Sequence, residues 1–438
     1  MRRRLIAALV LAAAGASGAE FTSSGTLGFR FRCSRTVRKT SDPTHPAVRL
    51  RLVHCPVLDV TLEETKRHPQ LWIDVHEAEP RKRYGNVLLS HLEGGRWYHL
   101  AVAWDAPTGR LEVFLNGVRQ QYAIRGFRKP QPWKPPPRLS GDLVFGATPA
   151  AGDPTLRIET DSAKVWTRFL DEAEVRAELG GLKLLALDGE GRTVHAAPLD
   201  LAPYTLTPVY QADFSRPLSV VAEDALFDGE RRTRLPEGKD WVLEGPGRAW
   251  TEKGRLHIES SRPTQGGHVV LWNTRTLPAD FLLEFAVSPR DSSNGLNIVF
   301  FCATSREGGD IFGLSLPRRG GIFKNYHTGA LNSYHISYWA GGLRRTANLR
   351  KNYGFFLPAC GDDRIANQGP GPHTVRLLKA GGSIRLETRG RIALAFDDGG
   401  KTYGPVHGPG RIGLRQMGHT HRASYSAFKV WRVEPKPR

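Results

Sequence analysis

The chain has 438 residues, which is more than one hydrophobic core usually supports, so its length excludes a single small domain and predicts two. Its 40% hydrophobic and 24% charged residues are those of an ordinary globular protein, and both halves can bury a core. The formal net charge of +19 favours a polyanionic partner, although a genome rich in G and C would explain the many dispersed arginines equally well.

The first residues, "MRRRLIAALVLAAAGASGAE", have the order of a cleaved secretory signal, with three arginines, a short apolar run and small residues. We therefore predict a signal peptide over residues 1–19 and an exported protein, periplasmic or extracellular. The apolar run is short for a bilayer, and no later segment has the composition of a membrane span. For an exported protein, the polyanionic partner we expect is an acidic polysaccharide and not a nucleic acid.

The chain has four cysteines, two in each half: Cys33, Cys55, Cys302 and Cys360. Export permits disulfides, so Cys33 with Cys55 and Cys302 with Cys360 are possible bridges. Buried free thiols are an equal alternative, and the scattered spacing is not that of a metal site.

Residues 20–187 consist of short apolar runs separated by Gly, Pro and Asn turns, which is typical of an antiparallel β-sandwich. The segments "WYHLAVAWD" and "RLEVFLNG" predict two paired strands joined by "APTG". Asn116 and Gly117 then predict a tight turn with positive φ.

These residues, with "DSAKVWTRFLDEAEV" further on, resemble a laminin G or concanavalin A-like jelly roll, which implies an accessory role. Members of that family often bind calcium or sugar. Asp105 and Asn116 have suitable ligand chemistry, but turn formation accounts for both more simply. We therefore predict no cofactor and no metal, with a structural calcium ion left open.

Residues 188–209, rich in Pro, Gly and small residues, predict a linker, with an extra strand or a packed connector as alternatives. From Tyr210 the β pattern resumes in runs such as "RLHIES", "FLLEFAVSP" and "HTVRLLKA". Their even spacing predicts a second sandwich over 210–438. The fold class expected is all-β, with two concanavalin A-like jelly-roll β-sandwich domains in tandem.

Several consecutive motifs of the second half resemble one family. They are "DIFGLSLPRRGGIFKNYHTGALNSYHISYW", "RTANLRKNYGFFL", "KTYGPVHGPGRIGLRQMG" and "YSAFKVWRV". This stretch is similar to the domain of unknown function 1961 family, which is concanavalin A-like and occurs among bacterial polysaccharide-utilisation genes, including those for pectic rhamnogalacturonan. The resemblance implies a jelly roll and a carbohydrate context, and it implies no reaction.

The stretch "YHISYW" predicts a strand whose period of two places His335, Ser337 and Trp339 on one face, with a Tyr/Ile/Tyr core face opposite. In "TANLRK" the same rule groups Asn348 with Arg350. A hairpin between Trp339 and Arg345 would return these two to the face of His335. An arginine there offers a planar fork to a sugar carboxylate, and a tryptophan offers a stacking plate.

Other candidate residues come from loops. Tyr326 and His327 are expected on a loop before that strand, where both could reach a cleft. His419 and His421 are two apart, a spacing that would place both on one face of a strand, but a third metal ligand is missing. The predicted substrate-binding set is Trp339, Ser337, Asp310, Gln416, His419 and His421.

Glu284 stands alone in "FLLEFAV", so the strand-borne carboxylates of a retaining glycosidase are missing. The residues instead suit β-elimination from a uronic acid polymer, a lyase reaction. Arg350 and Asn348 would hold the substrate carboxylate, His335 or His327 would take the C5 proton, and Tyr326 would protonate the leaving oxygen. The alternatives are a non-catalytic glycan-binding protein, a glycoside hydrolase and a structural envelope protein that mediates adhesion.

Overall fold

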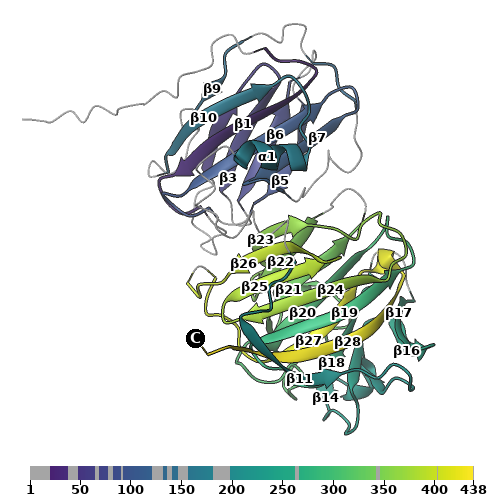
Figure 1. Ribbon diagram of the computed structural model, residues 1–438. Coiled ribbons are helices and arrows are strands. Elements are labelled where there is room, and N and C mark those ends of the chain that lie inside the picture. Colours follow the sequence, from purple (N-terminus) through teal and green to yellow (C-terminus); the bar gives the residue numbers. More distant parts are fainter. Residues whose placement is uncertain are drawn as a thin grey trace, which may run out of the picture. The chain divides into compact units, whose positions relative to one another are not determined.

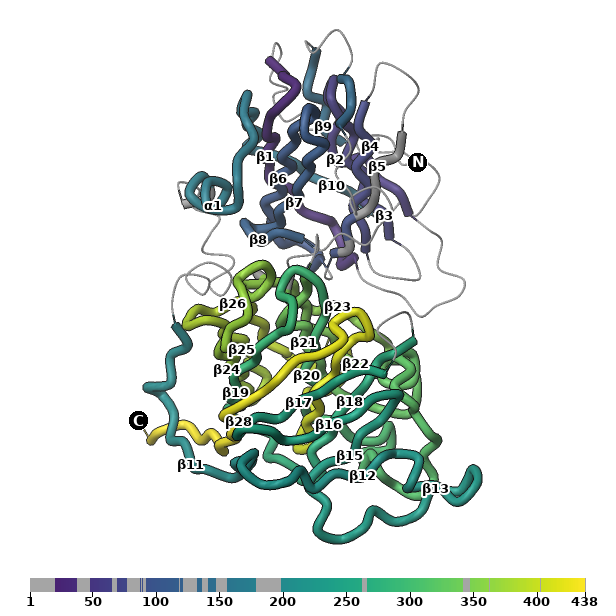
Figure 2. The backbone as a smooth tube through the Cα atoms, turned by 90° about the vertical axis from the view of Figure 1, so that its right-hand side faces the viewer, coloured from purple at the N-terminus to yellow at the C-terminus, as the bar shows by residue number. Residues whose placement is uncertain are grey.

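The computed structural model describes residues 20–37, 48–64, 69–76, 82–89, 92–120, 132–135, 141–146, 156–180, 198–261, 266–341, 346–401 and 403–437. The chain divides into two compact units, residues 1–187 and 188–438, and each is a β-sandwich (Figures 1 and 2). The fold is therefore all-β, as expected from the alternating apolar runs. The predicted signal peptide over residues 1–19 lies outside the described residues.

The N-terminal unit packs two five-stranded antiparallel sheets around one core. The first sheet has the order β10 (Ile158–Trp166), β1 (Ser24–Cys33), β6 (Trp97–Asp105), β7 (Arg110–Leu115) and β8 (Val118–Arg119). The second has the order β5 (Lys82–Leu88), β4 (Gln70–Val75), β3 (Leu58–Glu64), β2 (Val48–His54) and β9 (Val144–Phe145). Helix α1 (Glu172–Gly180) packs on the outer face of the first sheet through Val175 (Figure 1).

The predicted hairpin of the first sheet is present, since β6 and β7 pair from Leu100 opposite Leu115 to Asp105 opposite Arg110. The second tight turn has φ values of 52° at Asn116 and 72° at Gly117. The Asn116 side chain also accepts a hydrogen bond from a backbone N–H at 2.9 Å, so it stabilises the turn.

The C-terminal unit has two larger sheets, here called sheet A and sheet B. Sheet A has the order β16 (Gly247–Glu252), β17 (Arg255–Ser260), β28 (Arg422–Pro435), β19 (Phe281–Pro289), β24 (His373–Ala380), β25 (Ser383–Thr388) and β26 (Arg391–Asp397), and β11 (Tyr204–Gln211) also pairs with β28. Sheet B has the order β12 (Val220–Ala222), β15 (Trp241–Glu244), β18 (Val269–Asn273), β27 (Arg411–Gln416), β20 (Leu296–Ser305), β21 (Leu331–Ala340), β22 (Thr346–Asn352) and β23 (Phe356–Asp362). The shorter elements are the ribbon β13 (Phe227–Asp228) and β14 (Arg231–Arg232), helix α2 (Lys324–His327) and the 3-10 turns η2 (Glu223–Leu226) and η3 (Gly418–Thr420).

The main core of this unit lies between sheets A and B. A second apolar cluster covers the other face of sheet B, where Ile311, Phe312 and Tyr326 of the segment 306–328 pack on Trp272 and Phe300. This segment therefore forms a third layer over part of the sheet face that points away from the main core.

Strand β11 begins at Tyr204, inside the stretch that the sequence predicts as a linker, and it supplies the extra strand that was the alternative for that stretch. Leu199 is also packed, because it joins an apolar cluster on sheet A with Leu282, Leu378 and Val433. Its backbone N–H donates to a Glu387 carboxylate oxygen at 2.6 Å. The packed part of the unit therefore extends at least to Leu199.

We expect the start point of a C-terminal fragment to decide its stability. A fragment from Pro198 keeps Leu199 and β11, whereas one from Tyr210 loses Leu199 and most of β11 and exposes Leu282 and Leu378. Each buried leucine contributes about 1.5–3 kcal/mol, so the shorter fragment should be less stable by about 3 kcal/mol or more. Urea unfolding of the two fragments measures the difference, and equal midpoints would contradict the packing role of this segment.

The four cysteines are free thiols, so neither possible bridge is formed and the alternative of free thiols is confirmed. Burial raises the pKa of Cys33 to about 12 and that of Cys55 to about 11, which leaves both thiols protonated and inert. Within the described ranges, no helix has both the length and the apolar character that crossing a membrane requires.

Candidate functional site

The β21–β22 hairpin of sheet B brings together the polar residues that the sequence pattern singles out. His335 lies opposite Arg350, and Ser337 lies opposite Asn348. The expected hairpin between Trp339 and Arg345 is thus present, and it returns Asn348 and Arg350 to the face of His335. Tyr334, Ile336 and Tyr338 lie in the main core, which confirms the predicted core face. The polar side chains on the other face are here called the hairpin face: Ser333, His335, Ser337, Asn348, Arg350 and Asn352.

Hydrogen bonds fix the side chains of the hairpin face. The Asn352 amide donates to Ser333 Oγ at 2.9 Å and lies 2.9 Å from His335 Nδ1. The Asn348 amide donates to Ser337 Oγ at 3.2 Å. Because an amide N–H can only donate, His335 Nδ1 is the acceptor and the proton of its neutral ring is on Nε2.

His335 is only 2% exposed, and its ring packs against three phenylalanines, Phe300, Phe323 and Phe355, at centroid distances of 5.1–5.9 Å. Burial, with the nearby charge of Arg350, holds the pKa of His335 well below its usual range. The ring is therefore neutral, as the lyase hypothesis requires. A base with a strongly lowered pKa accepts protons poorly, however, and the buried ring offers no access to a polymer.

Aromatic side chains border the hairpin face where β22 ends. Phe355, with φ of 56°, stacks on His327 at 4.3 Å, and the Arg350 guanidinium lies 4.2 Å from the Phe355 ring centroid. Phe323 meets Phe355 edge-on at 5.5 Å. Tyr353 is 43% exposed and lies under the Arg306 guanidinium at 4.1 Å. We call this group the aromatic rim: Phe323, His327, Tyr353 and Phe355.

Tyr326 is not available as a catalytic acid, because it is 0% exposed. It lies in the short helix α2 and not on the expected loop, and its hydroxyl donates to Glu244 Oε2 at 2.6 Å. Burial raises the pKa of Tyr326 well above its usual range. Its neighbour His327 is half-buried and belongs to the aromatic rim, so the two adjacent residues have different surroundings.

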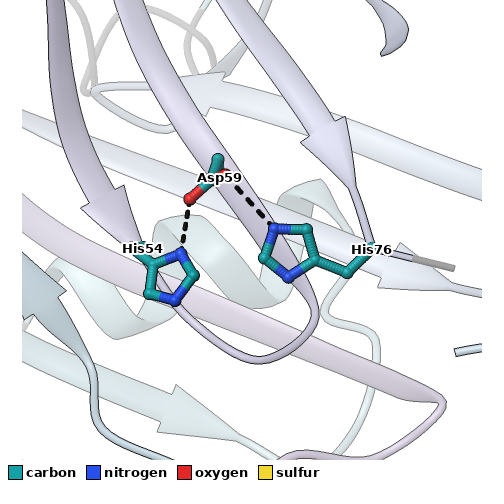
Figure 3. A group of neighbouring side chains, drawn as sticks. All are labelled: His54, Asp59 and His76. Carbon is teal, nitrogen blue, oxygen red and sulfur yellow. Dashed lines mark hydrogen bonds and ion pairs between the residues drawn. The ribbon is translucent and has the colours of Figure 1, made fainter. Parts of the chain in front are cut away.

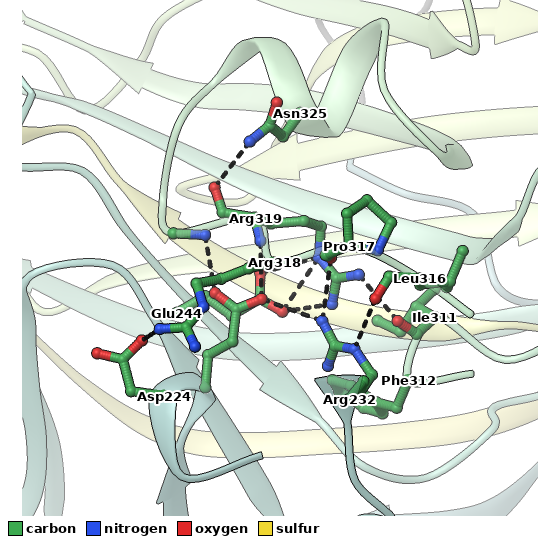
Figure 4. Close-up of polar contacts among 12 residues, drawn as sticks. Asp224, Arg232, Glu244, Ile311, Phe312, Leu316, Pro317, Arg318, Arg319 and Asn325 are labelled. Carbon is green, nitrogen blue, oxygen red and sulfur yellow. Dashed lines mark hydrogen bonds and ion pairs between the residues drawn. The ribbon is translucent and has the colours of Figure 1, made fainter. Parts of the chain in front are cut away.

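Through Glu244, Tyr326 joins a buried charge network that attaches the segment 306–328 to sheet B. Figure 4 shows its members Arg232, Glu244 and Arg319. The Arg319 Nε lies 3.1 Å from both carboxylate oxygens of Glu244. Glu223 accepts bonds from the backbone N–H groups of Arg319 and Gly320 at 2.8 and 2.7 Å, and it pairs with Arg232 at 3.1 Å. The network therefore positions His327 and Phe323 of the aromatic rim.

Three predicted substrate-binding residues lie on the core side or in an ion pair. Trp339 is in the main core, because a register shift next to Tyr338 inserts one residue and reverses the alternation. Gln416 is 0% exposed, and its amide donates to a backbone carbonyl at 2.6 Å. Asp310 forms an ion pair with Arg411 through two hydrogen bonds. Burial raises the pKa of Asp310, but the ion pair outweighs burial and the net pKa is lowered. The predicted substrate contact of Trp339 and Gln416 is wrong.

The two C-terminal histidines also differ from expectation. His419 lies in the 3-10 turn η3 and His421 follows it with φ of 56°, so they do not share one strand face. In the part of the chain that the structure describes, these histidines form no group of three possible metal ligands. The expectation that they line one strand is therefore wrong.

Sequence reasoning missed the aromatic rim and the role of Asn352. The motif "KNYGFF" carries Asn352, Tyr353 and Phe355, and its glycine between aromatic residues is a turn signal. That signal could have placed the aromatic side chains at the end of a hairpin. No local pattern indicates that Phe323 reaches the same place from the segment 306–328.

One family model matches a stretch within the C-terminal unit. Residues 234–430 match the model of the domain of unknown function family DUF1961. The chain is 35% identical over 199 residues to the uncharacterized protein YesU of Bacillus subtilis (strain 168), a match that covers 44% of this chain and 89% of that protein.

Among solved structures, a Bacillus subtilis protein of unknown function with a galectin-like fold is 29% identical, with a TM-score of 0.44, over 53% of this chain and 100% of that chain. The carbohydrate-binding module CBM66 from Bacillus subtilis is 13% identical with a TM-score of 0.30, over 44% of this chain and 94% of its own. The laminarinase from Rhodothermus marinus is 10% identical with a TM-score of 0.35, over 53% of this chain and 99% of its own. From the family match and the extent of the YesU similarity, the chain belongs to the DUF1961 family through its C-terminal domain.

Proposed function

We propose that the C-terminal domain binds a polysaccharide at the aromatic rim and that Arg350 gives it a preference for acidic glycans. The observation that carries the proposal is the partly exposed aromatic rim, where the Arg350 guanidinium lies 4.2 Å from the Phe355 ring centroid, although Arg350 itself is 5% exposed. Aromatic rings stack on sugar rings, and a guanidinium matches a carboxylate. The net charge of +19 adds long-range attraction for a polyanion.

Binding is favoured over cleavage in this proposal. Of the three residues assigned to proton transfer, His335 and Tyr326 are buried and held in neutral forms, whereas His327 is half-buried in the aromatic rim. We also propose that the protein acts outside the cytoplasm, on the composition of residues 1–19. Mass spectrometry of the exported protein should find the N-terminus near Glu20.

Calorimetric titration of a short uronate oligosaccharide and its carboxyl-reduced counterpart tests the proposal. Arg350→Lys keeps the charge but loses the planar fork, so it should weaken binding of the acidic ligand by about 10-fold and hardly change binding of the reduced one. Arg248→Lys is a control for an arginine over an aromatic ring, because Arg248 lies 4.4 Å from the Trp250 ring centroid, but Arg248 is 69% exposed and Arg350 is 5% exposed.

Salt and ultraviolet absorbance separate the remaining alternatives. Salt at about 0.5 M should weaken the binding of a long polyanion, whereas a short acidic oligosaccharide should still bind. Growth of unsaturated-uronate absorbance would support the lyase hypothesis, and new reducing ends without absorbance would indicate a hydrolase. Equal wild-type affinity for the acidic and reduced ligands would refute the acidic preference, and no glycan binding would refute the proposed function.

A further inference from the structure

His54, Asp59 and His76 of the N-terminal unit meet at the end of two adjacent hairpins (Figure 3). His54 and Asp59 lie directly opposite each other on β2 and β3. His76 follows β4, and its backbone N–H donates to the Val57 carbonyl at 2.7 Å, which fixes it beside the β2–β3 turn. His54 and Asp59 therefore lie on paired strands, and a backbone hydrogen bond holds His76 beside them.

The distances suit a small ion. His54 Nδ1 lies 2.6 Å from one Asp59 carboxylate oxygen, and His76 Nε2 lies 3.2 Å from the other. One ligand atom from each residue lies within 4.8 Å of the other two. Ligands of a tetrahedral ion with bonds of about 2.0–2.1 Å are about 3.4 Å apart, so small side-chain rotations would complete the geometry.

The hydrogen bonds of His76 supply a separate argument. Its Nδ1 lies 3.1 Å from the Pro56 carbonyl oxygen, which can only accept, so Nδ1 carries a proton. Nε2 then faces a second acceptor, the Asp59 carboxylate, which either the second N–H of an imidazolium or a cation bound to Nε2 would satisfy. A backbone carbonyl that holds the remote N–H is the usual support of a metal-binding histidine, which favours the cation.

We propose that His54, Asp59 and His76 form a Zn²⁺ site with an open fourth position. Two imidazoles and one carboxylate suit zinc, whereas Ca²⁺ takes six to eight oxygen ligands. The Asp59 side chain is 5% exposed, and those of His76 and His54 are 12% and 36% exposed, so the carboxylate is buried and one side opens to solvent. The cationic side chain of Arg51 lies 3.8 Å from Asp59 and is 42% exposed, so it can turn away.

The test uses the whole protein without a histidine tag, stripped with a chelator and titrated with Zn²⁺, and with Co²⁺ as a visible substitute. Wild type should bind one Zn²⁺ per chain in the micromolar range or tighter. His54→Gln and Asp59→Asn should each weaken binding by at least about 10-fold. His419→Gln, at an exposed position of the other unit, should bind as wild type does.

Thermal unfolding provides a second readout, since Zn²⁺ that binds the native state should raise the melting temperature of wild type but not of His54→Gln. If Asp59→Asn fails to fold, the result for His54→Gln decides the test, because His54 is the more exposed side chain. Absence of zinc binding, or wild-type affinity and stoichiometry in His54→Gln, would overturn the proposal and leave a hydrogen-bonded cluster. A melting shift with Ca²⁺ and none with Zn²⁺ would also overturn it.

Discussion

Arg319→Met should destabilise the C-terminal domain by about 3–5 kcal/mol, the cost of breaking a buried ion pair from one side. The Arg319 side chain is 2% exposed and its partner Glu244 is 0% exposed. Without Arg319, Glu244 keeps the hydroxyl of Tyr326 as a donor, but its buried charge is no longer balanced. Burial and the charge of Glu244 already raise the pKa of Glu223, and loss of Arg319 adds to that cost.

The neighbouring residue provides a matched control for Arg319→Met. Arg318 pairs with Asp224, but the two side chains are 43% and 82% exposed (Figure 4). Arg318→Met should therefore cost about 1 kcal/mol or less. Urea unfolding of the C-terminal domain measures both variants, and equal shifts would contradict the structural role of the network. Because the segment 306–328 carries Phe323 and His327, Arg319→Met should also weaken glycan binding.

Acid should destabilise the same domain strongly, by about 5 kcal/mol between pH 7 and about pH 4.5, through the buried His335 and the half-buried His407. Burial, reinforced by the charge of Arg350, holds the pKa of His335 well below the ordinary 6.5, and burial together with Lys351 lowers that of His407 to about 4. The unfolded chain binds protons at these rings near pH 6.5, whereas the native state resists them. Stability is therefore full above about pH 6.5 and falls as the pH decreases below it.

The variant His335→Gln isolates one of these protons. Its amide oxygen can still accept from Asn352, and it cannot titrate. The stability gap between wild type and this variant should narrow by about 2–3 kcal/mol from pH 7 to about pH 4.5. His419→Gln, at an exposed position, is the control. A gap that stays constant with pH would mean that His335 is protonated equally in the folded and unfolded chains.

The sequence by itself determined the all-β fold, the hairpin of β6 and β7 and the pairing of β21 with β22, because strand periodicity and turn residues are local properties. His335 and Ser337 share a face with Asn348 and Arg350 for the same reason. The strand pattern gave the wrong face for Trp339 because one extra residue is inserted next to Tyr338. This register shift reverses the face to which every later side chain of the strand points.

Only the tertiary structure decided that the polar side chains of the hairpin face are buried and which of their neighbours are accessible. Tyr326 and His327 are adjacent in sequence. Tyr326 is nevertheless buried and bonded to Glu244 of the distant strand β15, whereas His327 lies in the aromatic rim. Burial depends on the long-range packing of the segment 306–328 over sheet B, which no local pattern encodes. The meeting of His54 and Asp59 with His76 has the same origin, because strand pairing and not chain neighbourhood brings them together.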